Sequence, residues 1–285
     1  MTVFGKIIKA LRMAEVMLMT GFILVGAVFA VSDKGDVEWG SLLLLSVVSY
    51  VLMLSVYTAN SWLGYSHDKH NQRLNAQNLF PKSFYLFATI VFYLVSFVMC
   101  WWMNPHALPM HFIIFVLWFL YGMPGFGKHL PIIGTVIHFL VAVVQFNFAY
   151  VFFAPVSEVS LFISMYFALL ISAGHLHHEI IDYEADKSNR IKTSTVKWGI
   201  NNTKNVSFLI FVVAHLYWAV LFWQQIIDAF QLLVFALGFI VHAVLFIHIN
   251  TDLEPEIKKR LKYRTTYRLV YLICGMVLTV KTLCF

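Results

Sequence analysis

The chain is short of charged residues and of cysteine. Only 12% of its 285 residues are Asp, Glu, Lys or Arg, whereas 60% are hydrophobic. A soluble domain of this size does not need so much apolar surface. The three cysteines, Cys100, Cys274 and Cys284, have no CxxC spacing, so neither a disulfide framework nor a zinc site is expected. The composition favours a membrane protein.

The apolar residues fall into segments of the length that a bilayer requires, about 20 residues per helix. The first segment has no small-residue cleavage site behind it, so we expect it to be retained rather than removed as a signal peptide. The sequence predicts an all-α polytopic membrane bundle, with residues 1–285 forming a single domain. Nine transmembrane helices are predicted, at 11–32, 40–59, 83–103, 107–123, 130–153, 158–177, 206–226, 229–250 and 267–284.

The basic residues are distributed unevenly between the predicted loops. If the amino terminus is cytoplasmic, every Lys and Arg except Lys34 and Lys281 also falls on the cytoplasmic side. This is a strong positive-inside pattern, which predicts cytoplasmic polar loops and explains the net charge of +6 without a nucleic-acid partner. We interpret the basic stretch at 254–268, EPEIKKRLKYRTTYR, as a solvated face near anionic lipid.

Four of the 14 acidic residues gather in residues 177–193, HHEIIDYEADKSNRIKT. If the preceding apolar segment continues as a helix, Glu179, Asp182 and Asp186 stand at i, i+3 and i+7 and share one face. Three carboxylates on one face repel one another, and the arrangement is costly in a membrane protein unless a cation lies among them. Oxygen ligands of this kind suit Mg²⁺ bridged to phosphate oxygens.

A second polar stretch, ANSWLGYSHDKHNQRLN at 59–75, follows the second predicted helix. On a continuing helix Asn60, Gly64 and Asp68 are spaced i, i+4 and i+8 and stay on one side. The amide oxygen of Asn60 and the carboxylate of Asp68 could hold a second cation. The two polar stretches end helices that are four apart in the predicted order, which hints at an internal duplication.

The pair of stretches resembles the two aspartate-rich motifs of the UbiA superfamily of intramembrane prenyltransferases. The first motif of that family runs Asn-x-x-x-Asp-x-x-x-Asp; Asn60 and Asp68 match it, and Gly64 replaces the middle Asp. The second runs Asp-x-x-Asp-x-x-x-Asp followed by a basic residue and Thr. It is matched by Glu179, Asp182, Asp186, Lys192 and Thr193, with Glu179 as a conservative replacement of the first Asp. The likeness covers essentially the whole chain, including the number of helices.

The resemblance implies a Mg²⁺-dependent enzyme that transfers an isoprenyl group from a prenyl diphosphate to a small-molecule acceptor, such as an aromatic compound or quinone precursor, in a central cavity of the bundle. It implies metal binding by Asp68, Glu179, Asp182 and Asp186, with Asp68, Asp182 and Asp186 catalytic. The expected substrate-binding residues are Asn60, Tyr121, Lys128, Arg190 and Lys192. Tyr121 and Lys128 lie in LYGMPGFGKHLPIIG, after the fourth helix, and resemble a Tyr and a Lys of the family that face the diphosphate.

Several alternatives stay open on the sequence alone. The absence of a carboxylate at Gly64 fits an active enzyme with a weaker first site, altered chemistry or an inactive scaffold, and His67 is the nearest polar substitute. A terpene cyclase of the same superfamily would use the same motifs without an acceptor. A non-catalytic membrane protein such as a transporter is a further alternative. The histidines at 67, 70, 175, 177 and 178 have the wrong spacing for di-iron boxes. No residue selects the acceptor, the prenyl length or an oligomeric state.

Overall fold

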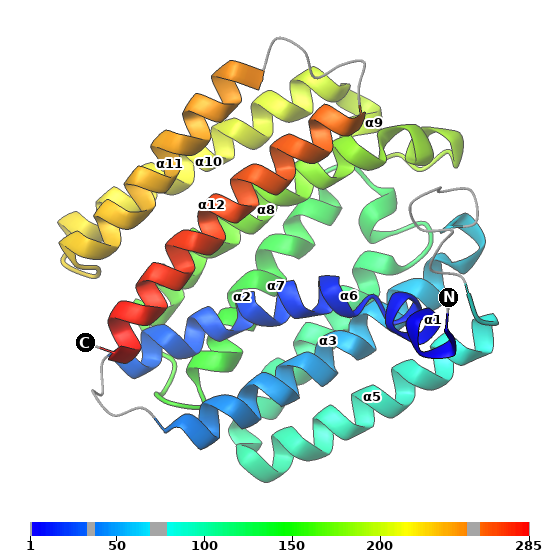
Figure 1. Ribbon diagram of the computed structural model, residues 1–285, viewed down its shortest axis with the longest axis horizontal. Helices are drawn as coiled ribbons and strands as arrows, with labels where there is room; N and C mark the ends of the chain where they lie inside the picture. Colours follow the sequence, from blue (N-terminus) through cyan, green and yellow to red (C-terminus); the bar gives the residue numbers. More distant parts are fainter. Residues whose placement is uncertain (1, 33–37, 69–78, 250–256, 285) are drawn as a thin grey trace. The chain divides into compact units, whose positions relative to one another are not determined.

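The computed structural model describes residues 2–32, 38–68, 79–249 and 257–284, and every regular element within these ranges is a helix (Figure 1). The all-α prediction is therefore confirmed for this part of the chain. Lys34, Lys69, His70 and Arg73 lie outside the described residues, as do the side chains of His67, Asp68, Lys258 and Cys284.

Eight helices in the described ranges are long and apolar enough to span a membrane. The ninth predicted segment lies within a further long helix, α12, so each predicted segment coincides with a helix. The chain is an integral multi-pass membrane protein. The α-helices are α1 (Val3–Ala10), α2 (Met13–Ser32), α3 (Trp39–Asp68), α5 (Lys82–Met103), α6 (Leu108–Gly122), α7 (Ile133–Tyr150), α8 (Glu158–Ser188), α9 (Ser194–Trp198), α10 (Ile200–Trp223), α11 (Ala229–Ile249) and α12 (Ile257–Cys284), and the short 3₁₀ helices are η1 (Pro105–Ala107) and η2 (Gly127–His129).

The two helices that carry the motifs extend well beyond their apolar segments. α3 continues past residue 59 to Asp68, and α8 continues past residue 177 to Ser188. Neither extension contains a proline, so the backbone hydrogen bonds can continue into the polar sequence. The motif residues Asn60, Asp182 and Asp186 consequently lie on helices, as their spacing predicts.

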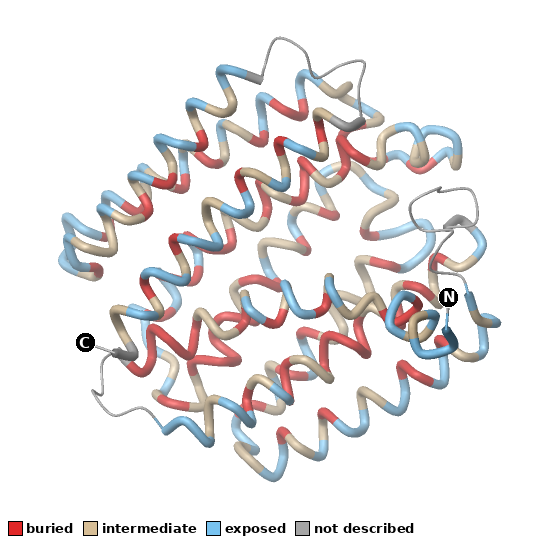
Figure 2. The backbone as a smooth tube through the Cα atoms, in the orientation of Figure 1, coloured by how far each residue is buried: buried red, intermediate tan, exposed pale blue. Residues whose placement is uncertain are grey.

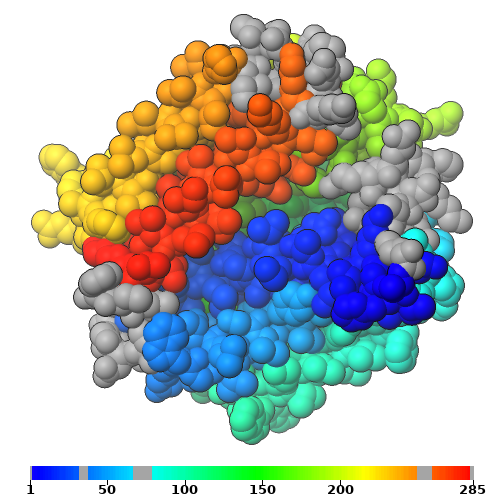
Figure 3. Space-filling view, in the orientation of Figure 1, coloured from blue at the N-terminus to red at the C-terminus, as the bar shows by residue number. Residues whose placement is uncertain are grey.

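The chain divides into two compact units, each with one motif helix. Unit 1 comprises residues 1–129 and 144–156, and within it α3 packs against α2, α5 and α6. Unit 2 comprises residues 130–143 and 157–285, and within it α8 packs against α10 and α12. α11 and α12 of this unit also lie side by side (Figure 3). That residues 1–285 form a single domain stays a prediction.

The surface of α5 shows the polarity expected of a lipid-facing helix. Its exposed positions are largely apolar and include Phe87, Leu94 and Trp102, whereas Thr89 and Ser96 are buried. The buried residues recur about once per helical turn, with exposed residues between them (Figure 2). An apolar outer face and small polar residues within are typical of helices that pack inside a bilayer.

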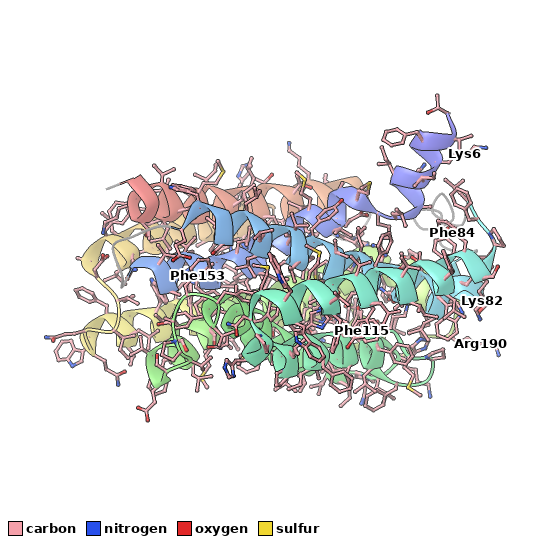
Figure 4. The ribbon with its side chains drawn as sticks, turned by 90° about the horizontal axis from the view of Figure 1, so that it is seen from below. Lys6, Lys82, Phe84, Phe115, Phe153 and Arg190 are labelled. Carbon is pink, nitrogen blue, oxygen red and sulfur yellow. The ribbon has the colours of Figure 1, made fainter. Side chains whose placement is uncertain are left out.

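Two basic residues of unit 1 lie at the same end of its helices. Lys6 on α1 and Lys82 at the start of α5 are at one end in Figure 4, and Phe153, which follows α7, is at the other. This placement agrees with the expectation that the charged loops of this unit share one side of the membrane. That this side is the cytoplasm stays a prediction.

Gly26 allows a very close approach between α2 and the end of α7 within unit 1. A Cβ atom at Gly26 would lie 1.9 Å from the carbonyl oxygen of Phe146, whereas one at Gly21 would meet no atom within 4 Å. We therefore expect Gly26→Ala to lower the free energy of unfolding by about 1–3 kcal/mol through overpacking. Gly21→Ala, the matched control on the same helix, should be neutral or slightly stabilising. Unfolding in detergent micelles measures both, and equal stabilities would contradict this packing.

Candidate active site

The second motif occupies the last turns of α8 in unit 2. The helix ends at Ser188, and the N–H of Ile191 donates to the carbonyl of Asp186 at 2.9 Å. Arg190 has a φ of 58°, in the left-handed region that usually takes glycine at this position. This closing turn reverses the chain directly after the carboxylates. Arg190 and Lys192 are both exposed, and Arg190 lies at the edge of the ribbon in Figure 4.

Glu179 is the most enclosed of the three motif carboxylates, with 6% of its surface exposed. Its Oε2 atom accepts hydrogen bonds from the backbone N–H of Thr195 at 3.0 Å and from the hydroxyl of Thr195 at 3.4 Å. Its Oε1 atom lies 3.8 Å from Nδ1 of His175, beyond ordinary hydrogen-bond distance. One oxygen of Glu179 thus secures the start of α9 to α8.

The residue before Thr195 makes a second attachment within unit 2. The hydroxyl of Ser194 accepts a hydrogen bond from the N–H of Ile132 at 3.0 Å. Ile132 has a φ of 70°, which is unfavourable for a β-branched residue and requires support from its surroundings. The turn that bears Lys192 is therefore fixed on one side by α8 and on the other by the segment that leads into α7.

Asp182 and Asp186 differ from Glu179 in being only partly buried. They are one helical turn apart, so both carboxylates lie on the same side of α8. Oδ2 of Asp182, whose side chain is 16% exposed, lies 3.3 Å from Nε2 of His178. These two aspartates are better placed than Glu179 to meet a ligand from outside the protein core.

The first motif lies on α3 in unit 1. The Oδ1 atom of Asn60 is buried and has no hydrogen-bond partner among the described residues. It lies 2.9 Å from the position that a Cβ atom at Gly122 would occupy, so the amide is close to the end of α6. Gly64 is buried on the same helix, one turn further on. An unpartnered buried amide oxygen is available to ligate a cation or to accept a hydrogen bond from a substrate hydroxyl.

Tyr121 and Lys128 lie at the end of α6 and in the η2 turn that follows it, also in unit 1. Both side chains are partly buried, and the Tyr121 ring makes an edge contact with Trp118, with the centroids 5.6 Å apart. Gly127 has a φ of 41° and lies so close to the carbonyl of Tyr121 that a Cβ would be 2.3 Å from the oxygen. Glycine at this position brings Lys128 back against the end of α6.

The histidines that could suggest a di-iron site have separate partners. Nδ1 of His175 contacts the hydroxyl of Thr135 at 3.2 Å, and the His177 ring packs against the rings of Tyr263 and Tyr267. His178 contacts Arg264 at 2.7 Å. Each ring thus belongs to a different contact, which gives no support to the di-iron alternative.

In each unit the oxygen donors of the motif are of the kind that Mg²⁺ prefers. Asp182 and Asp186 offer carboxylate oxygens on one face, and Asn60 offers a buried amide oxygen without a partner. Mg²⁺ prefers such oxygen ligands and usually keeps several waters. Within the described ranges no three His, Cys, Asp or Glu side chains form a group that could hold a metal, and Asp68 has its side chain outside them. The predicted ligand set of Asp68, Glu179, Asp182 and Asp186 thus stays a prediction.

The structure adds three residues that the motif spacing does not reveal. Thr195 holds Glu179, and His178 lies between Asp182 and Arg264. His178 directly precedes Glu179, and this adjacency is the one feature of the sequence that could have indicated its role. Nothing in the sequence indicates the contacts of Thr195 or Arg264, because both depend on how helices pack.

The comparison with protein families identifies the chain. The model of the UbiA prenyltransferase family matches residues 19–276. This match covers most of the chain, and the protein belongs to the UbiA prenyltransferase family. A comparison with curated proteins gave no significant match.

Solved structures of other proteins share the fold at low sequence identity. A UbiA homologue from Archaeoglobus fulgidus bound to GPP and Mg²⁺ is 17% identical, with a TM-score of 0.75 over 96% of this chain and 99% of that one. A digeranylgeranylglyceryl phosphate synthase is 16% identical, with a TM-score of 0.72 over 100% of both chains. A UbiA homologue from Aeropyrum pernix K1 is 13% identical, with a TM-score of 0.66 over 92% of this chain and 98% of that one. Identities this low establish the fold alone.

The contacts of Glu179 predict different effects for two substitutions. Glu179→Gln keeps an oxygen that can accept from Thr195, so it should fold normally. Glu179→Leu leaves the buried N–H of Thr195 without that acceptor, which should lower the free energy of unfolding by about 1–3 kcal/mol. Thermal unfolding of the two purified variants in detergent measures the difference, and equal stability of the Leu and Gln variants would show that the contact is dispensable.

Proposed function

We propose that this protein is an intramembrane prenyltransferase that moves an isoprenyl group from a prenyl diphosphate to a small-molecule acceptor. The family match over residues 19–276 supports the reaction class. The observation that carries the proposal is the end of α8, where Asp182 and Asp186 share one side of the helix and are not enclosed in the core. A relative of the same fold has been solved with GPP and Mg²⁺, which supports a diphosphate substrate.

We assign Mg²⁺ binding to Asp182 and Asp186, with Glu179 beside them, and extend the assignment to Asp68 of the first motif. When bound, Mg²⁺ would offset the negative charge that develops on the departing diphosphate. Glu179 combines this role with its hydrogen bonds to Thr195, so we expect it to contribute less to metal binding than the two aspartates.

The remaining motif residues would bind the diphosphate and orient the reaction. Lys128, Arg190 and Lys192 carry positive charge toward the leaving group, and Asn60 and Tyr121 donate or accept hydrogen bonds. The bond between C1 of the isoprenyl chain and the diphosphate oxygen breaks, and the electron pair leaves with the diphosphate. The acceptor supplies the electron pair for the new bond to C1 and then loses a proton. The apolar helices would exclude water from the allylic cation in the meantime.

A substrate panel on purified protein in nanodiscs tests the proposed reaction. Labelled GPP and DMAPP would be incubated with aromatic acids, quinone precursors and glycerol phosphates, in Mg²⁺ or in EDTA. We expect a prenylated acceptor and free diphosphate, formed only with the metal. A hydrocarbon formed without any acceptor would instead establish the cyclase alternative. Unchanged diphosphates throughout the panel would contradict both enzymatic readings.

Asp182→Asn should reduce turnover by about 10²–10³-fold or more, because the amide cannot supply the negative charge that the metal requires. Glu184→Gln is the matched control, because Glu184 is an exposed carboxylate two residues further along the same helix. It should keep turnover within about twofold. Thermal unfolding would verify that both variants are folded. Wild-type turnover in folded Asp182→Asn would exclude Asp182 from the site.

Gly64 offers a test of the first motif. Gly64→Asp would place a carboxylate one turn after Asn60 and one turn before Asp68, as in the family pattern. The Mg²⁺ concentration for half-maximal turnover should then stay unchanged or fall, whereas Gly64→Ala should not lower it. Titration of turnover with Mg²⁺ compares the two variants. An inactive but folded Gly64→Asp protein would mean that the first motif is arranged differently from that of the family.

A further inference from the structure

A chain of contacts joins α12 to the acidic end of α8 within unit 2. Nη1 of Arg264 lies 2.7 Å from Nδ1 of His178, and Nε2 of the same imidazole lies 3.3 Å from Oδ2 of Asp182. Arg264 and His178 are 86 positions apart in the sequence, so the contact depends on the packing of α12 against α8. Both ring nitrogens of His178 therefore have a neighbour: Arg264 at Nδ1 and Asp182 at Nε2.

The hydrogen-bonding chemistry of arginine fixes which nitrogen of His178 carries the proton. A guanidinium group has only donors, so Nδ1 of His178 must accept from Arg264. The proton of the neutral imidazole is therefore on Nε2, on the side of Asp182. Oδ2 of Asp182, an oxygen that can accept a hydrogen bond, lies 3.3 Å from that nitrogen. This oxygen of Asp182 is therefore turned toward His178.

Arg264 does not behave as part of a solvated basic face. The side chain of Arg264 is partly buried against α8, and Arg260, one turn earlier, is 4% exposed and donates to the carbonyl of Ile180 at 3.4 Å. Lys262, between them, is exposed. The interpretation of residues 254–268 as a solvated face near lipid is therefore wrong for Arg260 and Arg264. Within its described part, residues 259–268, the stretch has buried or partly buried residues that contact α8 and exposed residues such as Lys262.

We propose that Arg264 and His178 are positioning residues for Asp182. They hold Oδ2 of Asp182 and so fix the orientation of its carboxylate, and the positive charge of Arg264 offsets the repulsion within the acidic patch, the carboxylates Glu179, Asp182 and Asp186. This inference rests on the proposed function, because it assigns Asp182 to the metal. Partners that orient a metal ligand typically contribute 10–100-fold to metal affinity.

Metal binding and turnover, measured side by side, test the positioning role. Arg264→Gln removes the charge, Arg264→Lys keeps a donor, and Lys262→Gln is the matched control with the same loss of charge on the exposed side. The probe is Mn²⁺, and the fraction left free is read from its electron paramagnetic resonance signal in the presence of an unreactive prenyl thiodiphosphate. Turnover is titrated with Mg²⁺ in parallel.

We expect Arg264→Gln to weaken Mn²⁺ binding at least about tenfold, with a matching rise in the half-maximal Mg²⁺ concentration. Turnover at saturating Mg²⁺ should be largely restored, since the substitution changes an orientation and not a ligand. Arg264→Lys should stay within about threefold of wild type, and Lys262→Gln should be unchanged. A purely structural role for Arg264 would lower the amount of folded protein but leave the metal affinity of the folded fraction intact.

Wild-type Mn²⁺ affinity in folded Arg264→Gln would overturn the positioning role and leave the proposed function standing. Failure of the wild-type protein to bind Mn²⁺ and to turn over prenyl diphosphates would overturn both. If Arg264→Gln does not fold, His178→Leu carries the same expectation, because it breaks the connection and leaves Arg264 in place. Wild-type metal affinity in folded His178→Leu would also overturn the positioning role.

Discussion

A carboxylate beside a bilayer is costly unless another group compensates its charge, and the end of α8 is arranged around this requirement. Glu179 accepts hydrogen bonds from the backbone N–H and the hydroxyl of Thr195. Asp182 lies beside His178, which in turn contacts Arg264. These contacts explain why α9 and α12 both come against the same stretch of α8. Near the motif, the contacts that compensate these charges also connect α8 to its neighbours in unit 2.

The three carboxylates look equivalent in the sequence but have different surroundings in the protein. Glu179 lies in the core and ties the turn with Lys192 to α8, whereas Asp182 and Asp186 are only partly buried. One carboxylate thus holds the following turn in place, and the two less buried ones are those that we propose to meet the ligand. The replacement of aspartate by glutamate at position 179 fits this division, because the longer side chain can reach Thr195 while the helix keeps its register.

The helices that coincide with the nine predicted segments were predictable because each contains a long apolar run, whereas α1 and α9 are too short to hold one. The common face of Asp182 and Asp186 follows from helical spacing alone. Hydropathy misses the ends of α3 and α8, because a helix can continue into polar sequence after its apolar part ends. The pairing of Arg264 with His178 was out of reach for another reason. A basic stretch looks the same in sequence whether it faces lipid or a neighbouring helix, and only packing decides between them.

We propose above that the acidic patch at the end of α8 holds a metal together with a diphosphate. Calorimetric titration of the purified protein with an unreactive prenyl thiodiphosphate, with and without Mg²⁺, tests it most directly. By linkage, each ligand must tighten the binding of the other by the same factor. We expect Mg²⁺ to raise the affinity for the analogue at least about tenfold, within the range typical of such coupling. Equal affinity for the analogue in Mg²⁺ and in EDTA would contradict it.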